Sequence, residues 1–136
     1  MTPLPFTLDI AVTDRDIDEQ GHVNNVVYLR YVQDVATAHW NTLAHDTLKK
    51  QCAWVVLRHE IDYVNPAVAG DILEARTWVG ETTGVRSVRL VDLYLKGTQR
   101  VVARARTVWC LLNAQSRKPM RIDPVIISLL QPQSRA

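Results

Sequence analysis

The sequence contains only two cysteines, Cys52 and Cys110, and they do not form a Cys-x-x-Cys pair. This spacing argues against a disulfide framework and is typical of reduced thiols in a cytoplasmic protein. No apolar run approaches the roughly 20 residues that a membrane-spanning helix needs. The first residues also lack a basic segment followed by an apolar stretch, so we expect neither a secretory signal nor a membrane partner.

An excess of charge of one sign is absent as well. Sixteen Lys and Arg against fourteen Asp and Glu give a formal net charge of +2, and the sequence pI is about 8.7. Dedicated nucleic-acid-binding domains usually have a pI above about 9 and a concentrated basic face, so we expect no nucleic-acid partner. What is present is an ordinary globular composition, with 47% hydrophobic and 22% charged residues. The length predicts a single domain over residues 1–136.

Hydrophobic periodicity predicts the secondary structure. Residues 6–12 alternate apolar and polar as in a strand, and the polar run 13–21 follows as a loop. From Asn25 to about Ala44 the apolar residues recur at helical spacing, with Asn24 or Asn25 as a suitable N-cap. Further strands are predicted over residues 53–63, 72–79, 85–95 and 100–112, and a short final helix over 123–130.

This order of elements predicts an α+β protein in which a curved sheet packs around one long helix. Short connections require the last three strands to pair antiparallel. Stretches such as Val55 to Leu57 are apolar on both faces of their strand, and one helix can cover only one face of a sheet. A second subunit is the simplest cover for the other face, so we expect at least a dimer.

The loop before the long helix carries the most chemistry. Residues 14–31 read DRDIDEQGHVNNVVYLRY and place three carboxylates, a glycine, a histidine and two asparagines at the helix start. The first N–H groups of a helix have no intrahelical partner and carry partial positive charge, so they can hold a developing oxyanion. A nearby carboxylate could attack a carbonyl or activate a water. The loop is therefore a candidate site for acyl transfer to water.

The same loop has the pattern Asp18-x-x-Gly21-His22-Val23-Asn24-Asn25-x-x-Tyr28. This pattern resembles the signature of hotdog-fold acyl thioesterases, in particular the 4-hydroxybenzoyl-CoA thioesterase group and the plant acyl-carrier-protein thioesterases. The stretch 61–67 with Gly70-Asp71, and Arg117-Lys118-Pro119 after the last strand, also resemble the family. The resemblance extends from about residue 6 to residue 124.

The resemblance implies a hotdog fold, in which an antiparallel sheet of five or six strands wraps around one long central helix. In this family two such units pair into a continuous sheet, often doubled again to a tetramer, and the active sites lie at the dimer interface. No metal or cofactor is implied, because coenzyme A or acyl carrier protein enters as part of the substrate.

The resemblance also implies roles for individual residues. Asp18 would be the catalytic carboxylate, as nucleophile or general base, and the backbone N–H of Asn25 would polarise the thioester carbonyl. His22 would orient substrate or water. The substrate-binding candidates are Gly21, Asn24, Tyr28, Arg117 and Lys118. One departure is Gln20, where the acyl-carrier-protein branch carries an asparagine.

Together these observations predict a hydrolase that cleaves fatty acyl-CoA or acyl carrier protein thioesters. The main alternative is a non-catalytic module that binds acyl-CoA, and a dehydratase or hydratase ranks last. A calcium loop is not expected, although Asp14, Asp16 and Asp18 imitate its start. The sixth position is Glu19 instead of glycine, and the twelfth is Asn25 instead of glutamate.

Other polar residues receive a structural interpretation. The arginines of the last strands could meet the phosphates of coenzyme A, since arginine suits phosphate oxygens. For any single one of them an ordinary solvated or inter-subunit charged face is the favoured interpretation; they include Arg86, Arg89, Arg104 and Arg106. His39, His45 and His59 show no ligand spacing and are assigned no function.

Overall fold

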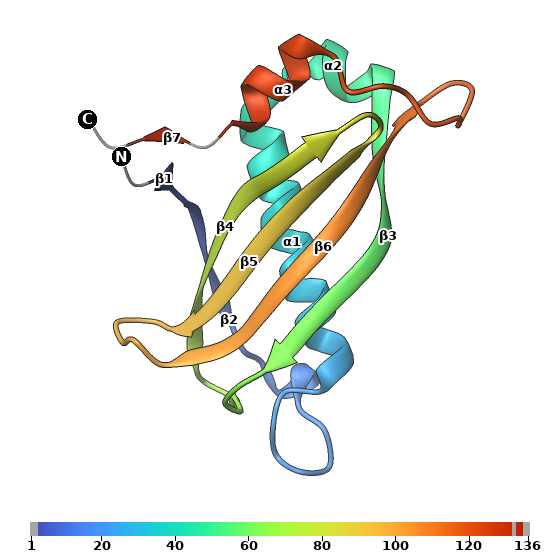
Figure 1. Ribbon diagram of the computed structural model, residues 1–136. Helices are drawn as coiled ribbons and strands as arrows, with labels where there is room; N and C mark the ends of the chain where they lie inside the picture. The colour runs from blue at the N-terminus through green and yellow to red at the C-terminus, as the bar shows by residue number, and fades with distance from the viewer. Residues whose placement is uncertain (1–2, 132, 135–136) are drawn as a thin grey trace.

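One long helix lies against one face of a twisted sheet in the computed structural model, which describes residues 3–131 and 133–134 (Figure 1). The helix α1 spans Asn25–Leu43. The strands are β2 (Phe6–Ala11), β3 (Cys52–Tyr63), β4 (Ile72–Thr83), β5 (Arg86–Leu95) and β6 (Val101–Asn113). They form a sheet in the order β2-β4-β5-β6-β3, and every pairing in it is antiparallel. The structure thus confirms the α+β fold of a five-stranded antiparallel sheet around one helix.

The helix begins where the sequence predicts. Asn24 is the N-cap, and its side-chain oxygen accepts a hydrogen bond from the Val26 N–H at 3.0 Å. The apolar face of the helix packs on the sheet, and burying each such side chain contributes about 1.5–3 kcal/mol to stability. The buried residues of this contact include Tyr28, Tyr31, Val32, Val35, Leu73, Ala75, Val91 and Leu93.

Two features of the fold differ from the prediction. The expected end of the predicted strand 72–79 is wrong, because β4 continues to Thr83 through a register shift against β5. Gly80 lies at this irregularity, and glycine inside a strand often marks a bulge instead of an end. The short helix α2 (Asp46–Gln51) was not anticipated; it is capped by His45, whose Nδ1 accepts from the Leu48 N–H at 3.1 Å.

Smaller elements complete the chain. A 3-10 turn (Asp14–Asp16) lies in the loop before α1, and the predicted last helix is α3 (Pro124–Leu130) with Asp123 as its N-cap. Strands β1 (Pro3–Leu4) and β7 (Gln133–Ser134) pair with each other. A second cluster of core residues joins α2 and α3 to the sheet and includes Leu48, Val79, Leu111, Ile122, Ile126 and Leu130.

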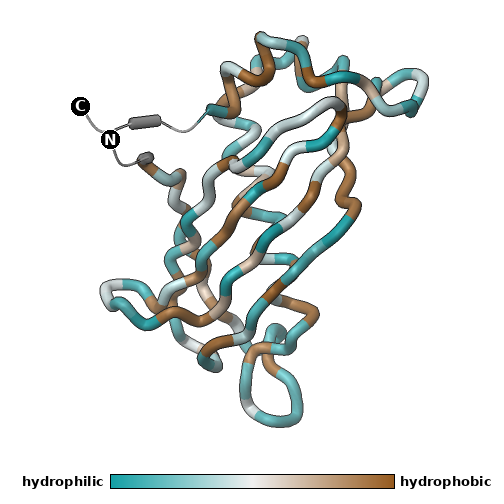
Figure 2. Tube along the Cα trace, in the orientation of Figure 1, coloured by the Kyte–Doolittle hydropathy of each residue, from teal (hydrophilic) through white to brown (hydrophobic). Residues whose placement is uncertain are grey.

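Strand β3 lies at one edge of the sheet. Its first half is hydrophobic and its second half polar (Figure 2). Leu57 interrupts the pairing of β3 with β6 and is 50% exposed, and Tyr63 at the end of the strand is 45% exposed. A long edge strand with exposed apolar side chains is a template for pairing with another chain.

Neither a membrane-spanning helix nor a metal site occurs in the part of the chain that the structure describes. No helix there has both the length and the apolar character needed to cross a bilayer. The same residues contain no group of three or more His, Cys, Asp and Glu arranged to hold a metal ion. Cys52 and Cys110 are both buried and free.

Candidate active site

Asp16 anchors the loop between β2 and α1, and it is only 3% exposed. Its carboxylate accepts hydrogen bonds from the Thr13 N–H at 3.0 Å and the Tyr31 hydroxyl at 2.8 Å, and it pairs with Arg30 at 2.7 Å. Burial alone raises the pKa of Asp16, but these hydrogen bonds and the Arg30 charge outweigh it and lower the pKa to about 2. The Asp16 carbonyl also accepts from the Asn24 N–H at 2.8 Å, which ties the loop to the helix cap.

Asp18 is half-buried in a tight turn that follows this anchor. Its N–H donates to the His22 carbonyl at 2.9 Å, and its carbonyl accepts from the Gly21 N–H at 3.1 Å. One carboxylate oxygen accepts from the Gln20 N–H at 2.8 Å, and the other has no protein partner among the described residues. Gly21 has a φ of 79°, which glycine adopts without strain. The turn therefore holds Asp18 with one oxygen available for chemistry.

The first turn of α1 leaves one backbone donor unused. The Val26 N–H is taken by the Asn24 side chain and the Val27 N–H by the Asn24 carbonyl at 2.9 Å. The N–H of Asn25 has no hydrogen-bond partner among the residues described. A free N–H at a helix N-terminus is a suitable donor for an oxyanion. This is the donor that the family resemblance implies.

The structure brings five of the candidate residues together at one end of α1, namely Asp18, Gly21, His22, Asn24 and Asn25 (Figure 1). Tyr28 is 3% exposed, and its hydroxyl accepts from the Ala67 N–H at 3.2 Å. Arg117 and Lys118 are exposed in the turn after β6, at the opposite end of the sheet. Within one subunit these two cations do not meet the loop, and the roles of all eight residues stay predictions.

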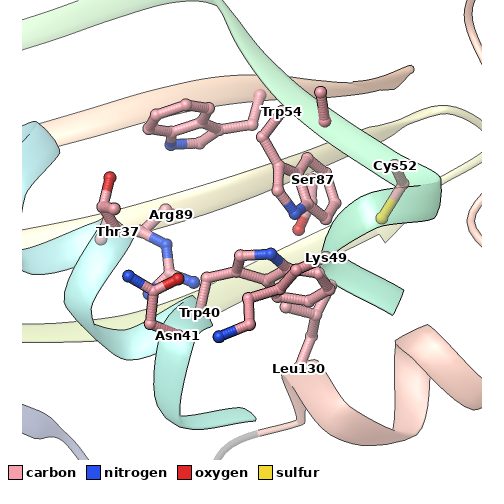
Figure 3. Close-up of a pocket in the computed structure, with 12 residues that line it drawn as sticks. Thr37, Trp40, Asn41, Lys49, Cys52, Trp54, Ser87, Arg89 and Leu130 are labelled. Carbon is pink, nitrogen blue, oxygen red and sulfur yellow. The ribbon is translucent and has the colours of Figure 1, made fainter. Parts of the chain in front are cut away.

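A cavity of about 280 Å³ lies away from this loop, between the second half of α1, α2 and the strands β3, β5 and β6 (Figure 3). Trp40, Trp54 and Trp109 form part of its wall. Ser87 and Arg89 reach it from β5. No pattern in the sequence indicates this cavity.

Arg89 is 6% exposed, so its interpretation as part of a solvated face is wrong. Its Nη1 donates to the Nδ1 of His39 at 2.9 Å and lies 3.2 Å from the Thr77 hydroxyl. Strand alternation could have revealed this burial, because Arg89 shares a face of β5 with the core residues Val91 and Leu93.

His39 should make the stability of the fold depend on pH. Burial, followed by the charge of Arg89, lowers the pKa of His39 to about 4 from an ordinary value of 6.5. A lowered histidine pKa contributes stability above pH 6.5, and the contribution is lost as pH falls through 4. After allowance for partial solvent exposure, the loss at pH 5 is about 1 kcal/mol.

The measurement is urea unfolding at pH 7 and pH 5 for the wild type and His39→Gln. Glutamine can accept from Arg89 through its side-chain oxygen without titrating. The wild type should therefore lose about 1 kcal/mol more than the variant between the two pH values. Equal losses would show that His39 does not titrate in this range.

Comparison with known proteins identifies the family of this chain. The family model of the thioesterase-like superfamily matches residues 12–130. The chain belongs to the thioesterase-like superfamily. The match covers the loop, α1 and all strands of the sheet after β2.

The chain is similar in sequence to two kinds of thioesterase, one acting on acyl-CoA and the other on acyl carrier protein. Long-chain acyl-CoA thioesterase FadM of Escherichia coli is 25% identical over 119 residues, which cover 84% of this chain and 88% of FadM. Palmitoyl-acyl carrier protein thioesterase from the chloroplast of Arabidopsis thaliana is 23% identical over 140 residues, covering 95% of this chain. The chain spans about a third of the length of the chloroplast relatives, since the match covers 34% of each.

Solved structures share the fold. The PA5185 protein of Pseudomonas aeruginosa aligns with a TM-score of 0.83 at 20% identity, over 98% of this chain and all of that chain (100%). Slr0204, a 1,4-dihydroxy-2-naphthoyl-CoA thioesterase from Synechocystis, aligns with a TM-score of 0.80 at 18% identity, over 93% of this chain and 95% of that chain. The expected hotdog fold is confirmed by these likenesses.

Proposed function

We propose that the protein hydrolyses acyl thioesters to a free acid and a thiol. The observation that carries the proposal is the pairing of an available Asp18 oxygen with an unused Asn25 N–H in one loop-and-helix unit of a thioesterase-like chain. Hydrolysis of a thioester needs a carboxylate base or nucleophile and a donor for the oxyanion, and this unit presents both.

The thioester carbonyl docks at the start of α1 with its oxygen near the Asn25 N–H. Asp18 then attacks the carbonyl carbon or takes a proton from an attacking water. The thiolate of the pantetheine arm leaves as the tetrahedral intermediate collapses. If Asp18 is the nucleophile, a water then hydrolyses the resulting acyl anhydride, which releases the acid and restores the carboxylate. Because a thiol has a pKa of about 8.5, this leaving group needs no strong general acid. His22, exposed beside Asp18, orients the substrate or the water.

The carrier is coenzyme A or acyl carrier protein. The names of FadM and of the chloroplast relatives support both carriers, since one acts on acyl-CoA and the others on acyl carrier protein. The exposed Arg117 and Lys118 supply cations suited to phosphate oxygens. Two buried free cysteines support a reducing compartment, so the proposed location is the cytoplasm.

The working unit is proposed to be a homodimer joined along β3. Strand β3 has twelve residues and exposes Leu57, whereas the other edge strand, β2, has six. A two-fold axis at the middle of β3 pairs it antiparallel with its copy, so the start of one β3 lies beside the end of the other. Assembly of such dimers into tetramers stays a prediction.

This dimer would complete the site. The Tyr63 hydroxyl, at the end of β3, donates to the Asn25 carbonyl at 3.3 Å, so the helix start lies beside that strand end. Trp54, near the start of β3, lines the cavity. Antiparallel pairing therefore sets the cavity of one subunit next to Asn25 of the partner subunit.

Leu57→Lys tests the dimer. Two copies of the lysine would meet near the two-fold axis, where their charges repel and their desolvation is unfavourable. We expect the wild type to show twice the subunit mass of 15.4 kDa in light scattering, and the variant to shift to the monomer. Val125→Lys is the matched control, because Val125 is 67% exposed on α3. A variant that keeps the wild-type mass would place the interface elsewhere.

The activity is tested by thiol release from a panel of acyl-CoAs, from short to long chains and including aromatic acyl groups. Turnover on any member of the panel supports the proposal. The same acyl groups on acyl carrier protein form the second arm. Tight binding without thiol release in either arm would favour the non-catalytic module instead.

A further inference from the structure

Arg89 is a buried cation that neither the core nor the proposed hydrolysis explains. Guanidinium has five N–H donors, and the contacts at Arg89 use only Nη1, through His39 and Thr77. Its Nε and Nη2 have no hydrogen-bond partner, and Arg89 forms no salt bridge, among the residues that the structure describes. A buried charge without an opposite charge is unfavourable for folding, so stability alone does not account for arginine at this position.

The described lining of the cavity around Arg89 also lacks a carboxylate, although Thr37, Asn41 and Ser87 offer neutral side-chain acceptors. Among the described residues that line the cavity there is no Asp or Glu, and Lys49 adds a second cation. The Nε1 of Trp109 is buried without a hydrogen-bond partner. Arg89 therefore presents free N–H donors and positive charge to a cavity whose described lining has no anion of its own.

Three tryptophans make part of the cavity wall flat and apolar, beside the polar side chains of Thr37, Asn41 and Ser87. Trp40 and Trp54 contact edge to face, with ring centroids 5.6 Å apart, and Trp109 completes the aromatic lining. Such walls suit a short hydrocarbon chain or a single ring (Figure 3). A volume of about 280 Å³ is at the low end for small-molecule pockets. The shape suits a compact apolar body, and the free donors suit an anionic end.

We propose that the acyl group of the substrate enters this cavity and ends in a carboxylate that Arg89 binds. This inference rests on the proposed thioester hydrolysis and on the proposed dimer, which sets the cavity of one subunit next to the helix start of the other. It names the substrate class, which is thioesters of compact dicarboxylic acids. The two oxygens of the substrate carboxylate would accept hydrogen bonds from Nε and Nη2 of Arg89. An acyl group with a plain methyl end would instead bury those donors without a partner, which disfavours its binding.

The test compares thioesters that differ only at the far end of the acyl group. One series carries ω-carboxyl groups on four- to ten-carbon acyl-CoAs, and the matched series carries methyl groups at the same length. A third pair is 4-carboxybenzoyl-CoA and 4-methylbenzoyl-CoA. In the wild type, kcat/KM for the best carboxylated member should exceed that of its methyl partner by about 10- to 100-fold, as a charge-assisted hydrogen-bonded pair provides.

Arg89→Met should reverse this preference, because the cavity then offers an apolar end of similar length. Arg89→Lys keeps the positive charge but loses the planar pair of N–H donors of a guanidinium. It should retain a part of the preference for acyl groups that end in a carboxylate. Arg86→Met is the matched control, because Arg86 is exposed on the same strand. This variant should prefer a carboxylate end over a methyl end as strongly as the wild type does. Circular dichroism and melting curves show whether each variant is folded. Arg89→Lys keeps the test valid if Arg89→Met does not fold.

A binding measurement separates this inference from the proposed function. Non-hydrolysable thioethers of coenzyme A, with ω-carboxyalkyl or alkyl groups, should quench the fluorescence of the tryptophans that line the cavity. Tighter binding of the carboxylated thioether that is lost in Arg89→Met supports the inference even if turnover is absent. Hydrolysis that favours methyl ends in the wild type, or a preference that survives in Arg89→Met, overturns the inference and leaves thioester hydrolysis standing.

Discussion

Asp18→Asn is expected to lower kcat for thioester hydrolysis by about 10²- to 10⁴-fold, the range typical for loss of a general base. The asparagine side chain keeps an oxygen that can accept from the Gln20 N–H, so the turn around residue 18 should persist. It has no negative charge with which to attack a carbonyl or to accept a proton from water. Thiol release under saturating acyl-CoA measures the effect.

Asp14→Asn is the matched control for this experiment. Asp14 lies four residues earlier in the same loop, is exposed, and belongs to the 3-10 turn instead of the turn that holds Asp18. Its substitution removes the same charge and should change kcat by less than about 2-fold, since surface substitutions away from special features have small effects. If both variants retain full turnover, Asp18 is not the working carboxylate, and another base or a different site must be sought.

The candidate site could be predicted from the sequence because it is local. Asp18, Gly21 and Asn25 lie within one stretch, so the position of the helix start decides their proximity. The cap at Asn24 fixes that start, and capping follows from side-chain chemistry. Periodicity likewise predicted the helix and the strands to within a few residues, apart from the bulge at Gly80.

The cavity could not be predicted in this way because it is made by distant segments. Trp40 is on α1, Trp54 on β3 and Arg89 on β5, and only the folded sheet brings them together. Alternation along β5 could place Arg89 on the inner face, but no pattern in the sequence says that the space in front of it is empty. The dimer also stays a prediction. An exposed edge strand indicates where a second subunit could pair, but it does not show that the pairing forms.

Asp16→Ala is expected to be the most destabilising single substitution in the loop. It removes the acceptor for four groups at once: the Thr13 N–H, the Thr13 hydroxyl, Arg30 and the Tyr31 hydroxyl. Tyr31 is only 1% exposed, so water cannot replace the lost acceptor without opening the core. Leaving a buried donor unsatisfied costs about 1–3 kcal/mol, and with the lost ion pair the total should be about 3 kcal/mol. Urea unfolding at pH 7 measures the change.

A second substitution identifies the cause. Tyr31→Phe removes the hydroxyl that Asp16→Ala leaves without a partner, so the double variant should be more stable than the sum of the single effects predicts, by about 1 kcal/mol. Additive effects would mean that the Tyr31 hydroxyl finds water after all. Turnover should also fall in Asp16→Ala, because the carboxylate anchors the loop segment whose backbone carbonyl at residue 16 accepts from the Asn24 N–H at 2.8 Å. A stable variant with full activity would show that the helix cap, and not this buried carboxylate, positions the Asn25 N–H for catalysis.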